Sequence, residues 1–142
     1  MASMTEKRLH TPREAETAFY AAFIKRDVDA MMAVWAESDN ISCVHPLGKI
    51  VTGRAAVRES WESIFRNSPE MQFMITERSR TQNGEIAMHI VEEHIRTKGE
   101  PPSAPMQVTN IYRLTEGGWR MILHHASPAS PAAQKAESKT LH

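Results

Sequence analysis

The fold of this chain is decided by residues 106–127, MQVTNIYRLTEGGWRMILHHAS. Two runs that contain many β-branched and aromatic residues stand on either side of Glu116-Gly117-Gly118, and these glycines suit a hairpin turn. The pattern therefore predicts two antiparallel strands, Met106–Thr115 and Trp119–Ser127.

The residues before this hairpin have the same character. Met71–Gln82 and Glu85–Thr97 read as two long strands, and Asn83-Gly84 between them is a second hairpin signal. Lys98–Pro105 is a longer loop that contains proline. Four consecutive strands with short turns predict an antiparallel meander.

Helical spacing replaces this pattern in the first half of the chain. Thr11-Pro12-Arg13-Glu14 combines an N-cap, a proline at the first helical position and a capping acid. Asp27 is a second N-cap, and a third helix is expected from about Arg54 to Asn67-Ser68-Pro69. Short strands are expected at Ile41–His45 and between Gly48 and Gly53.

Helices followed by a meander predict one α+β domain rather than parallel βαβ units. We expect this domain at residues 11–128, with an N-terminal arm at 1–10. The composition of residues 129–142, which is rich in Ala, Ser, Pro and Lys, predicts a disordered tail.

Composition excludes several classes of partner. Lys and Arg together number 17, as do Asp and Glu, so the formal net charge is zero and no basic surface for nucleic acid is expected. No run is long and apolar enough to span a membrane, and the charged N-terminus predicts no secretory signal. Cys43 is the only cysteine, which is compatible with a reducing cytoplasm.

The predicted strand at 85–97 carries apolar residues on both of its faces. Ile86, Met88 and Ile90 lie on one face, and Ala87, Val91 and Ile95 lie on the other. A sheet with one solvated face would alternate more cleanly between apolar and polar residues. We therefore expect one face to meet the helices and the other to meet a second copy of the chain in a homodimer.

Three segments of the chain carry a family pattern: FIKRDVDAMMAVW at 23–35, VHPLG at 44–48 continued by TGRAAVRESW at 52–61, and NIYRL through GWR to HHAS at 110–127. Together, in this order and spacing, they resemble a SnoaL-like domain of the nuclear transport factor 2-like superfamily. The resemblance implies a cystatin-like cone, in which helices pack in the concavity of a curved antiparallel sheet around one pocket. The third segment is also similar to the association domain of calcium/calmodulin-dependent protein kinase type II.

Ketosteroid isomerases of this superfamily offer a comparison for the site. Where they have an Asp base, a helix Tyr and a protonated Asp, segment matching places His45, Phe19 and Asn110. The resemblance thus implies His45 as the base and Asn110 or Tyr112 as the group that polarises a carbonyl. With all three family residues replaced, steroid-type isomerisation is not expected.

The association-domain resemblance also suggests which strand residues face the pocket. It places Met88, Ile90 and Glu92 there, together with His124. A Glu92–His124 pair would then act either as an acid/base couple or as a buried polar pair within the sheet. Trp35 and Trp61 complete the expected apolar wall.

The sequence leaves two functions open. The first is a homodimeric pocket protein that binds a small, largely apolar molecule, with cofactor-free isomerase, cyclase or dehydratase chemistry if it is an enzyme. The second is a non-catalytic oligomerisation module. No metal site is expected, because the seven histidines and one cysteine show no metal-ligand spacing.

Overall fold

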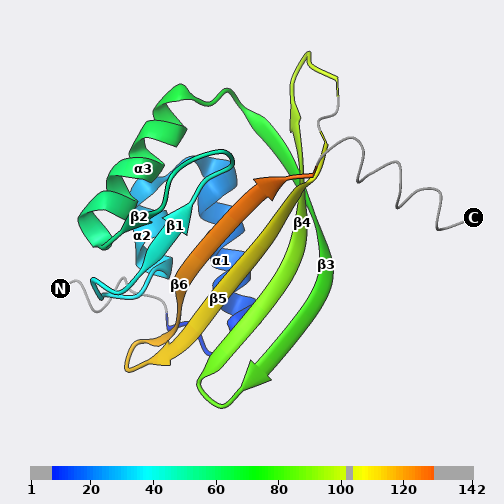
Figure 1. Cartoon of the computed structure of the whole chain (residues 1–142). Helices are drawn as coiled ribbons and strands as arrows, with labels where there is room; N and C mark the ends of the chain where they lie inside the picture. The colour runs from blue at the N-terminus through cyan, green and yellow to red at the C-terminus, as the bar shows by residue number, and fades with distance from the viewer. Residues whose placement is uncertain (1–7, 102–103, 130–142) are drawn as a thin grey trace, which may run out of the picture.

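The computed structural model describes residues 8–101 and 104–129 and has the α+β architecture that the sequence predicts. Three helices and six strands form one domain (Figure 1). Their bounds are α1 (Pro12–Lys25), α2 (Val28–Val34), β1 (Ser42–Val44), β2 (Val51–Thr52), α3 (Arg54–Asn67), β3 (Met71–Asn83), β4 (Ile86–Thr97), β5 (Met106–Thr115) and β6 (Gly118–Pro128).

All six strands belong to one sheet, in the order β2-β1-β6-β5-β4-β3. The predicted meander forms its larger part, and each of its strands is antiparallel to the next. One pairing departs from the antiparallel pattern, because β1 runs parallel to β6 over three residue pairs. In Figure 1 the curved sheet wraps around α1, and α3 lies beside β1 and β2.

The helix starts follow the capping signals in the sequence. The Thr11 hydroxyl accepts a hydrogen bond from the Glu14 backbone N–H at 3.0 Å, and Pro12 is the first residue of α1. The Asp27 carboxylate accepts from the Ala30 N–H at 3.0 Å and begins α2. These bonds satisfy N–H groups that have no partner within the helix.

The N-terminal segment is fixed to the sheet at Leu9, which is 4% exposed. Its carbonyl accepts from the Trp119 N–H at 2.7 Å. A Cβ on Gly118 would lie 2.5 Å from this same Leu9 oxygen, so only glycine fits here. The remainder of the predicted arm, residues 1–7, and residues 130–142 of the predicted tail lie outside the described residues.

The two faces of the sheet differ in what covers them. The inner face and the helices enclose a core that includes Phe19, Trp61 and Tyr112, each 0% exposed. The outer face leaves Ile86 and Met88 42% and 38% exposed, although both are apolar. The sheet therefore has the apolar residues on both faces that the sequence predicts.

Candidate functional site

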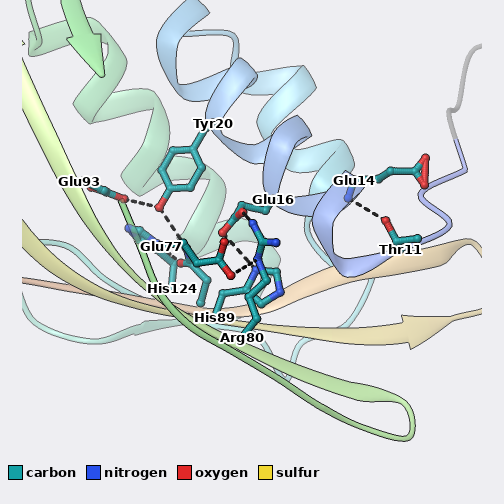
Figure 2. A network of polar contacts seen from close by, with 10 residues as sticks. Thr11, Glu14, Glu16, Tyr20, Glu77, Arg80, His89, Glu93 and His124 are labelled. Carbon is teal, nitrogen blue, oxygen red and sulfur yellow. Dashed lines mark hydrogen bonds and ion pairs between the residues drawn. The ribbon is translucent and has the colours of Figure 1, made fainter. Parts of the chain in front are cut away.

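A chain of polar side chains crosses the interior from β4 to β6. Its members come from four elements and are at most 6% exposed: Glu93, Tyr20, Asn110 and His124. The Tyr20 hydroxyl donates to Glu93 Oε2 at 2.7 Å and accepts from Asn110 Nδ2 at 3.1 Å. His124 Nδ1 lies 2.6 Å from Asn110 Oδ1. Figure 2 labels Glu93, Tyr20 and His124 of this set and draws the hydrogen bond between Tyr20 and Glu93. We call these four residues the buried chain.

Burial makes the buried chain electrostatically unusual. It lowers the pKa of His124 to about 3, with smaller contributions from His45 and His125. Burial also raises the pKa of Glu93 to about 7, although the hydrogen bond from Tyr20 opposes this. His124 is therefore an uncharged imidazole at neutral pH, while Glu93 exchanges its proton near neutrality.

His45 directly follows β1, and its ring lies close to His124, the member of the buried chain that comes from β6. Its ring centroid is 6.3 Å from that of His124 and 4.7 Å from that of Trp61. Its Nε2 lies 3.0 Å from the Ser60 hydroxyl, which donates its own proton to the Val57 carbonyl. Nε2 must therefore carry the hydrogen, and Nδ1 is left with a lone pair and no hydrogen-bond partner among the described residues.

The pKa of His45 falls to about 4 because the ring is largely removed from water. Cys43 Sγ is 3.5 Å from the same ring nitrogen, but burial raises the pKa of its thiol. A buried protonated thiol is a poor nucleophile. Two uncharged imidazoles, His45 and His124, are thus the basic groups of this region.

Trp61 packs beside both histidines and covers them from α3. Its ring centroid lies 5.6 Å from both Phe19 and His124 and 5.0 Å from Phe23. Trp61 is 0% exposed, and its indole Nε1 has no hydrogen-bond partner within residues 8–101 and 104–129. A buried donor without an acceptor is rare and costly.

A second polar cluster lies around Glu16, one helical turn before Tyr20 on α1 (Figure 2). The Glu16 carboxylate meets His89 Nδ1 and Arg80 Nη2, each at 3.1 Å. The Tyr112 ring packs on His89 with centroids 5.0 Å apart, and its buried hydroxyl has no partner in the described part of the chain. No contact in that part joins Tyr112 to His45, so the structure does not bring these two proposed catalytic residues together.

Two hollows open on the described surface, both away from the histidines. One of about 740 Å³ lies at the end of the β3–β4 pair, lined by residues 70–72 and 96–101. The other, of about 370 Å³, lies between α1 and β3 and is lined by Glu16, Thr17, Tyr20, Ala21, Ile24 and Ile75. His124 and Trp61 are 1% and 0% exposed, so neither hollow reaches them and this region is closed to solvent in the structure.

The predicted parity of β4 is wrong. Met88, Ile90 and Glu92 lie on the outer face, whereas Ala87, His89, Val91 and Glu93 are buried. The outer Glu92 carboxylate accepts from exposed Arg78 Nε at 2.6 Å, so no Glu92–His124 pair forms. Side chains alternate strictly along a strand, so a shift of one residue reverses every assignment.

The remaining expected site residues fall into two groups. Asn110, Trp61 and His124 are buried around one centre, and Val108 and Tyr112 share the inner face with Asn110 as strand alternation predicts. Trp35 is 1% exposed and ends α2, where its carbonyl accepts from Arg54 Nη1 at 3.2 Å. Trp35 shares no ring contact with the histidines among the described residues.

Sequence reasoning did not assign Glu93 or Tyr20 to the buried chain. Asn110 was expected to face inward, and in the structure it pairs with His89 of β4. Val91 and Glu93 follow His89 by two and four residues, so they lie on the same face of that strand. Cross-strand partners share a face of the sheet, so that register would have identified Glu93. Tyr20 follows Phe19 on α1, and both side chains are buried.

This chain belongs to the SnoaL-like domain family, whose sequence model matches residues 13–131. A structure from Thiobacillus denitrificans, a candidate calcium/calmodulin-dependent protein kinase type II association domain, is 40% identical. It covers 88% of this chain and 100% of its own, with a TM-score of 0.85.

A candidate dehydratase of the nuclear transport factor 2-like family from Streptomyces avermitilis is 29% identical, with a TM-score of 0.73, over 81% of this chain and 91% of its own. The F-box protein SKIP8 of Arabidopsis thaliana is 28% identical over 78% of this chain. The chain spans about half the length of that relative, 46%.

A ketosteroid isomerase-like protein from Erwinia carotovora atroseptica shares the fold at 19% identity and a TM-score of 0.69, over 84% of this chain and 94% of its own. These matches confirm the expected family and the cystatin-like, nuclear transport factor 2-like fold. Among the described residues, no helix is long and apolar enough to cross a membrane, and no three His, Cys, Asp or Glu side chains are grouped as metal ligands.

Proposed function

We propose that this chain is a homodimeric protein that binds a small, largely apolar carbonyl compound between α3 and the sheet. There it catalyses cofactor-free proton transfer of the kind used in isomerisation, aldol-type cyclisation or dehydration. One observation carries this proposal: two uncharged imidazoles, His45 and His124, lie with ring centroids 6.3 Å apart and both pack against Trp61, and each has one unprotonated ring nitrogen without a partner in the described chain.

The surroundings suit this chemistry. Phe19, Phe23 and Trp61 supply apolar ring surface, which is typical of small-molecule sites. An uncharged imidazole can accept a proton from the carbon next to a carbonyl and return it to another carbon or to a leaving hydroxyl. The unpartnered Trp61 Nε1–H is a donor that a bound carbonyl oxygen would satisfy.

Binding requires Trp61 to move, because its fully buried ring packs against both histidines. Trp61 lies on α3, which reaches the sheet mainly through β2 at its edge. A displacement of α3 would open a space beside the histidines while leaving the buried chain in place on α1 and the meander. Closure of such an element over substrate would also exclude water.

Proton exchange with solvent tests this function without knowledge of the physiological substrate. The protein is incubated in D₂O with a panel of small cyclic ketones, and loss of the α C–H signal is followed by NMR. We expect faster exchange for at least one ketone, and a loss of about 10²-fold or more in His124→Gln or His45→Gln, the scale of general-base catalysis.

His125→Gln is the matched control, because His125 is adjacent to His124 but exposed on the outer face. It should leave the exchange rate unchanged. If no ketone in the panel exchanges faster than with the His45→Gln, His124→Gln double variant, or if His125→Gln has an equal effect, the catalytic proposal fails.

The homodimer part of the proposal is supported by the outer sheet face. Met74, Ile86 and Met88 on this face are apolar and exposed, and exposed apolar patches mark interaction surfaces. Light scattering coupled to size exclusion should give twice the chain mass, and Met88→Glu should give the monomer. Leu47→Glu, at a position 93% exposed in the loop after β1, is the control and should leave the dimer intact.

A non-catalytic association module is the second candidate. It is favoured by the filled interior and by the 40% identity to a candidate association domain. On this alternative the mass in solution exceeds that of a dimer, and exchange of ketone protons is no faster with the wild type than with the histidine double variant.

A further inference from the structure

The buried chain joins four chemical groups whose hydrogen-bonding capacities differ. A carboxylate only accepts hydrogen bonds, a phenol donates one, and an amide donates on one side and accepts on the other. A neutral imidazole donates from one nitrogen and accepts at the other. These differences give the chain a direction.

That direction starts at Glu93. When its carboxylate accepts the Tyr20 hydrogen at 2.7 Å, the Tyr20 oxygen can only accept from its other neighbour. The Asn110 NH₂ must therefore face Tyr20, which it does at 3.1 Å. The Asn110 carbonyl oxygen is then turned toward His124.

The last contact follows from the others. His124 Nδ1 lies 2.6 Å from Asn110 Oδ1, a distance that requires a hydrogen on Nδ1. In a neutral imidazole the hydrogen on Nδ1 leaves Nε2 with its lone pair. Nε2 has no hydrogen-bond partner among the described residues.

The alternative tautomer of His124 cannot satisfy every hydrogen-bonding group of the buried chain. With its hydrogen on Nε2, His124 would turn a lone pair toward the Asn110 oxygen. A flip of the Asn110 amide would satisfy His124, but it would place that oxygen against the Tyr20 oxygen, whose hydrogen is held by Glu93. Two acceptors would then meet in a dry interior, where an unmade hydrogen bond is costly.

We propose that Glu93 is a positioning residue that fixes, through Tyr20 and Asn110, the tautomer of His124 in which Nδ1 is protonated and Nε2 is the free base. Glu93 lies at the opposite end of the chain from the imidazole, on β4, and acts only through the orientation of the groups between them. The assignment of His124 as the base rests on the proposed function, whereas the fixed tautomer does not.

A purely structural role predicts something different. If the buried chain only filled the interior, removal of Tyr20 or Glu93 would lower stability but leave the His124 tautomer as it is. The directional arrangement predicts that the tautomer changes even in a variant that stays folded. The position of one hydrogen therefore distinguishes the two roles.

Histidine tautomers are read directly from ¹⁵N-edited long-range NMR spectra. At pH 8, above the pKa of Glu93 of about 7, wild-type His124 should show a protonated Nδ1 and an unprotonated Nε2. The His124 signals are assigned by their absence in His124→Gln. Detection of the hydrogen on Nε2 in the wild type overturns the proposal.

Three variants test how the tautomer is fixed. Tyr20→Phe and Glu93→Leu should each give a mixture of the two His124 tautomers, because the Asn110 amide is free to flip. Glu93→Gln should largely retain the wild-type tautomer, since its amide oxygen still accepts from Tyr20. Glu16→Gln is the control, because it alters the other polar cluster of α1, one turn before Tyr20, and should change nothing at His124.

The outcomes separate the two proposals. If folded Tyr20→Phe and Glu93→Leu both keep the wild-type tautomer, the positioning role is wrong whatever the catalytic result. If Glu93→Leu does not fold, the comparison of Tyr20→Phe with Glu93→Gln still tests the positioning role. The role predicts mixed tautomers in Tyr20→Phe and the wild-type tautomer in Glu93→Gln. If the tautomers change as expected but the wild type exchanges no ketone protons faster than the histidine double variant, the positioning role stands and the catalytic function fails.

Discussion

Replacing Glu93 by Gln exchanges a carboxyl that is 2% exposed for an amide of nearly the same shape that stays uncharged at every pH. Burial raises the pKa of Glu93 from 4.5 to about 7, against the opposing effect of the Tyr20 hydrogen bond. Because the folded pKa lies above the unfolded value, ionisation favours the unfolded chain. The penalty is absent below pH 4.5, grows from pH 4.5 to 7 and is constant above pH 7.

The size of this penalty follows from the shift. About 2.5 pKa units at ~1.4 kcal/mol per unit correspond to about 3 kcal/mol of unfolding free energy above pH 7. The unfolding free energy of Glu93→Gln minus that of the wild type should therefore rise by about 3 kcal/mol between pH 4.5 and pH 8. Other titrations are common to both proteins and cancel in this difference.

Urea unfolding followed by tryptophan fluorescence measures both free energies at each pH. Glu92→Gln is the matched control, since it removes the adjacent carboxylate from the outer face, where its partner Arg78 is exposed. Its free-energy difference should be small, because the Arg78 side chain is 52% exposed and water screens the pair. A Glu93→Gln difference that stays flat or falls between pH 4.5 and pH 8 would refute the reasoning.

Other variants test the turns, the caps and the histidines. Gly118→Ala should lower the free energy of unfolding by about 1–3 kcal/mol, because φ is 106° and a Cβ would meet the Leu9 backbone at 2.5 Å. Gly84→Ala, at φ 65° with no atom close to the new Cβ, should lower it by less in the same thermal unfolding assay. Thr11→Ala should cost about 1 kcal/mol through loss of its cap, measured by urea unfolding, and no change would contradict the capping role. Burial lowers the pKa of His45 to about 4 and of His124 to about 3, so protonation favours the unfolded chain and stability should fall as pH drops from 6.5 toward these values. His124→Gln should reduce this fall by up to about 1.4 kcal/mol per pH unit, and an unchanged slope would contradict the buried, neutral state of His124.

The fold could be predicted because its signals are local. Thr11 and Asp27 cap the helices that follow them, and the turns at Asn83-Gly84 and Glu116-Gly117-Gly118 close the two hairpins. Each signal depends on a few neighbouring residues, so no knowledge of distant contacts is needed.

The faces of β4 could not be predicted in the same way. Both faces of β4 carry apolar side chains, so the hydrophobic pattern does not show which face is inward. The connection to β5, residues 98–105, is too long for turn geometry to fix the register between the two strands. The hydrophobic pattern is therefore equally compatible with Glu92 facing inward and with Glu93 facing inward. The sequence could show that one of two adjacent glutamates must face inward, but not which one.

A bulge made the parity of β6 equally hard to predict. Asn110 pairs with His124 and Tyr112 with Met121, so Ile122 is an extra residue in β6. The bulge lets Met121 and His124, three residues apart, both face the interior. Strict alternation from Trp119 would have placed His124 on the outer face.

The parallel contact between β1 and β6 joins two parts of the molecule that supply different groups to the interior. The buried chain belongs to α1 and the meander, whereas Trp61 and His45 belong to the segment from β1 to α3, whose strand β1 pairs with β6 over three residue pairs. Substitutions in that segment can reshape the wall of a site without altering the groups that set its polarity. Such modularity allows one chemical centre to be adapted to many molecular shapes.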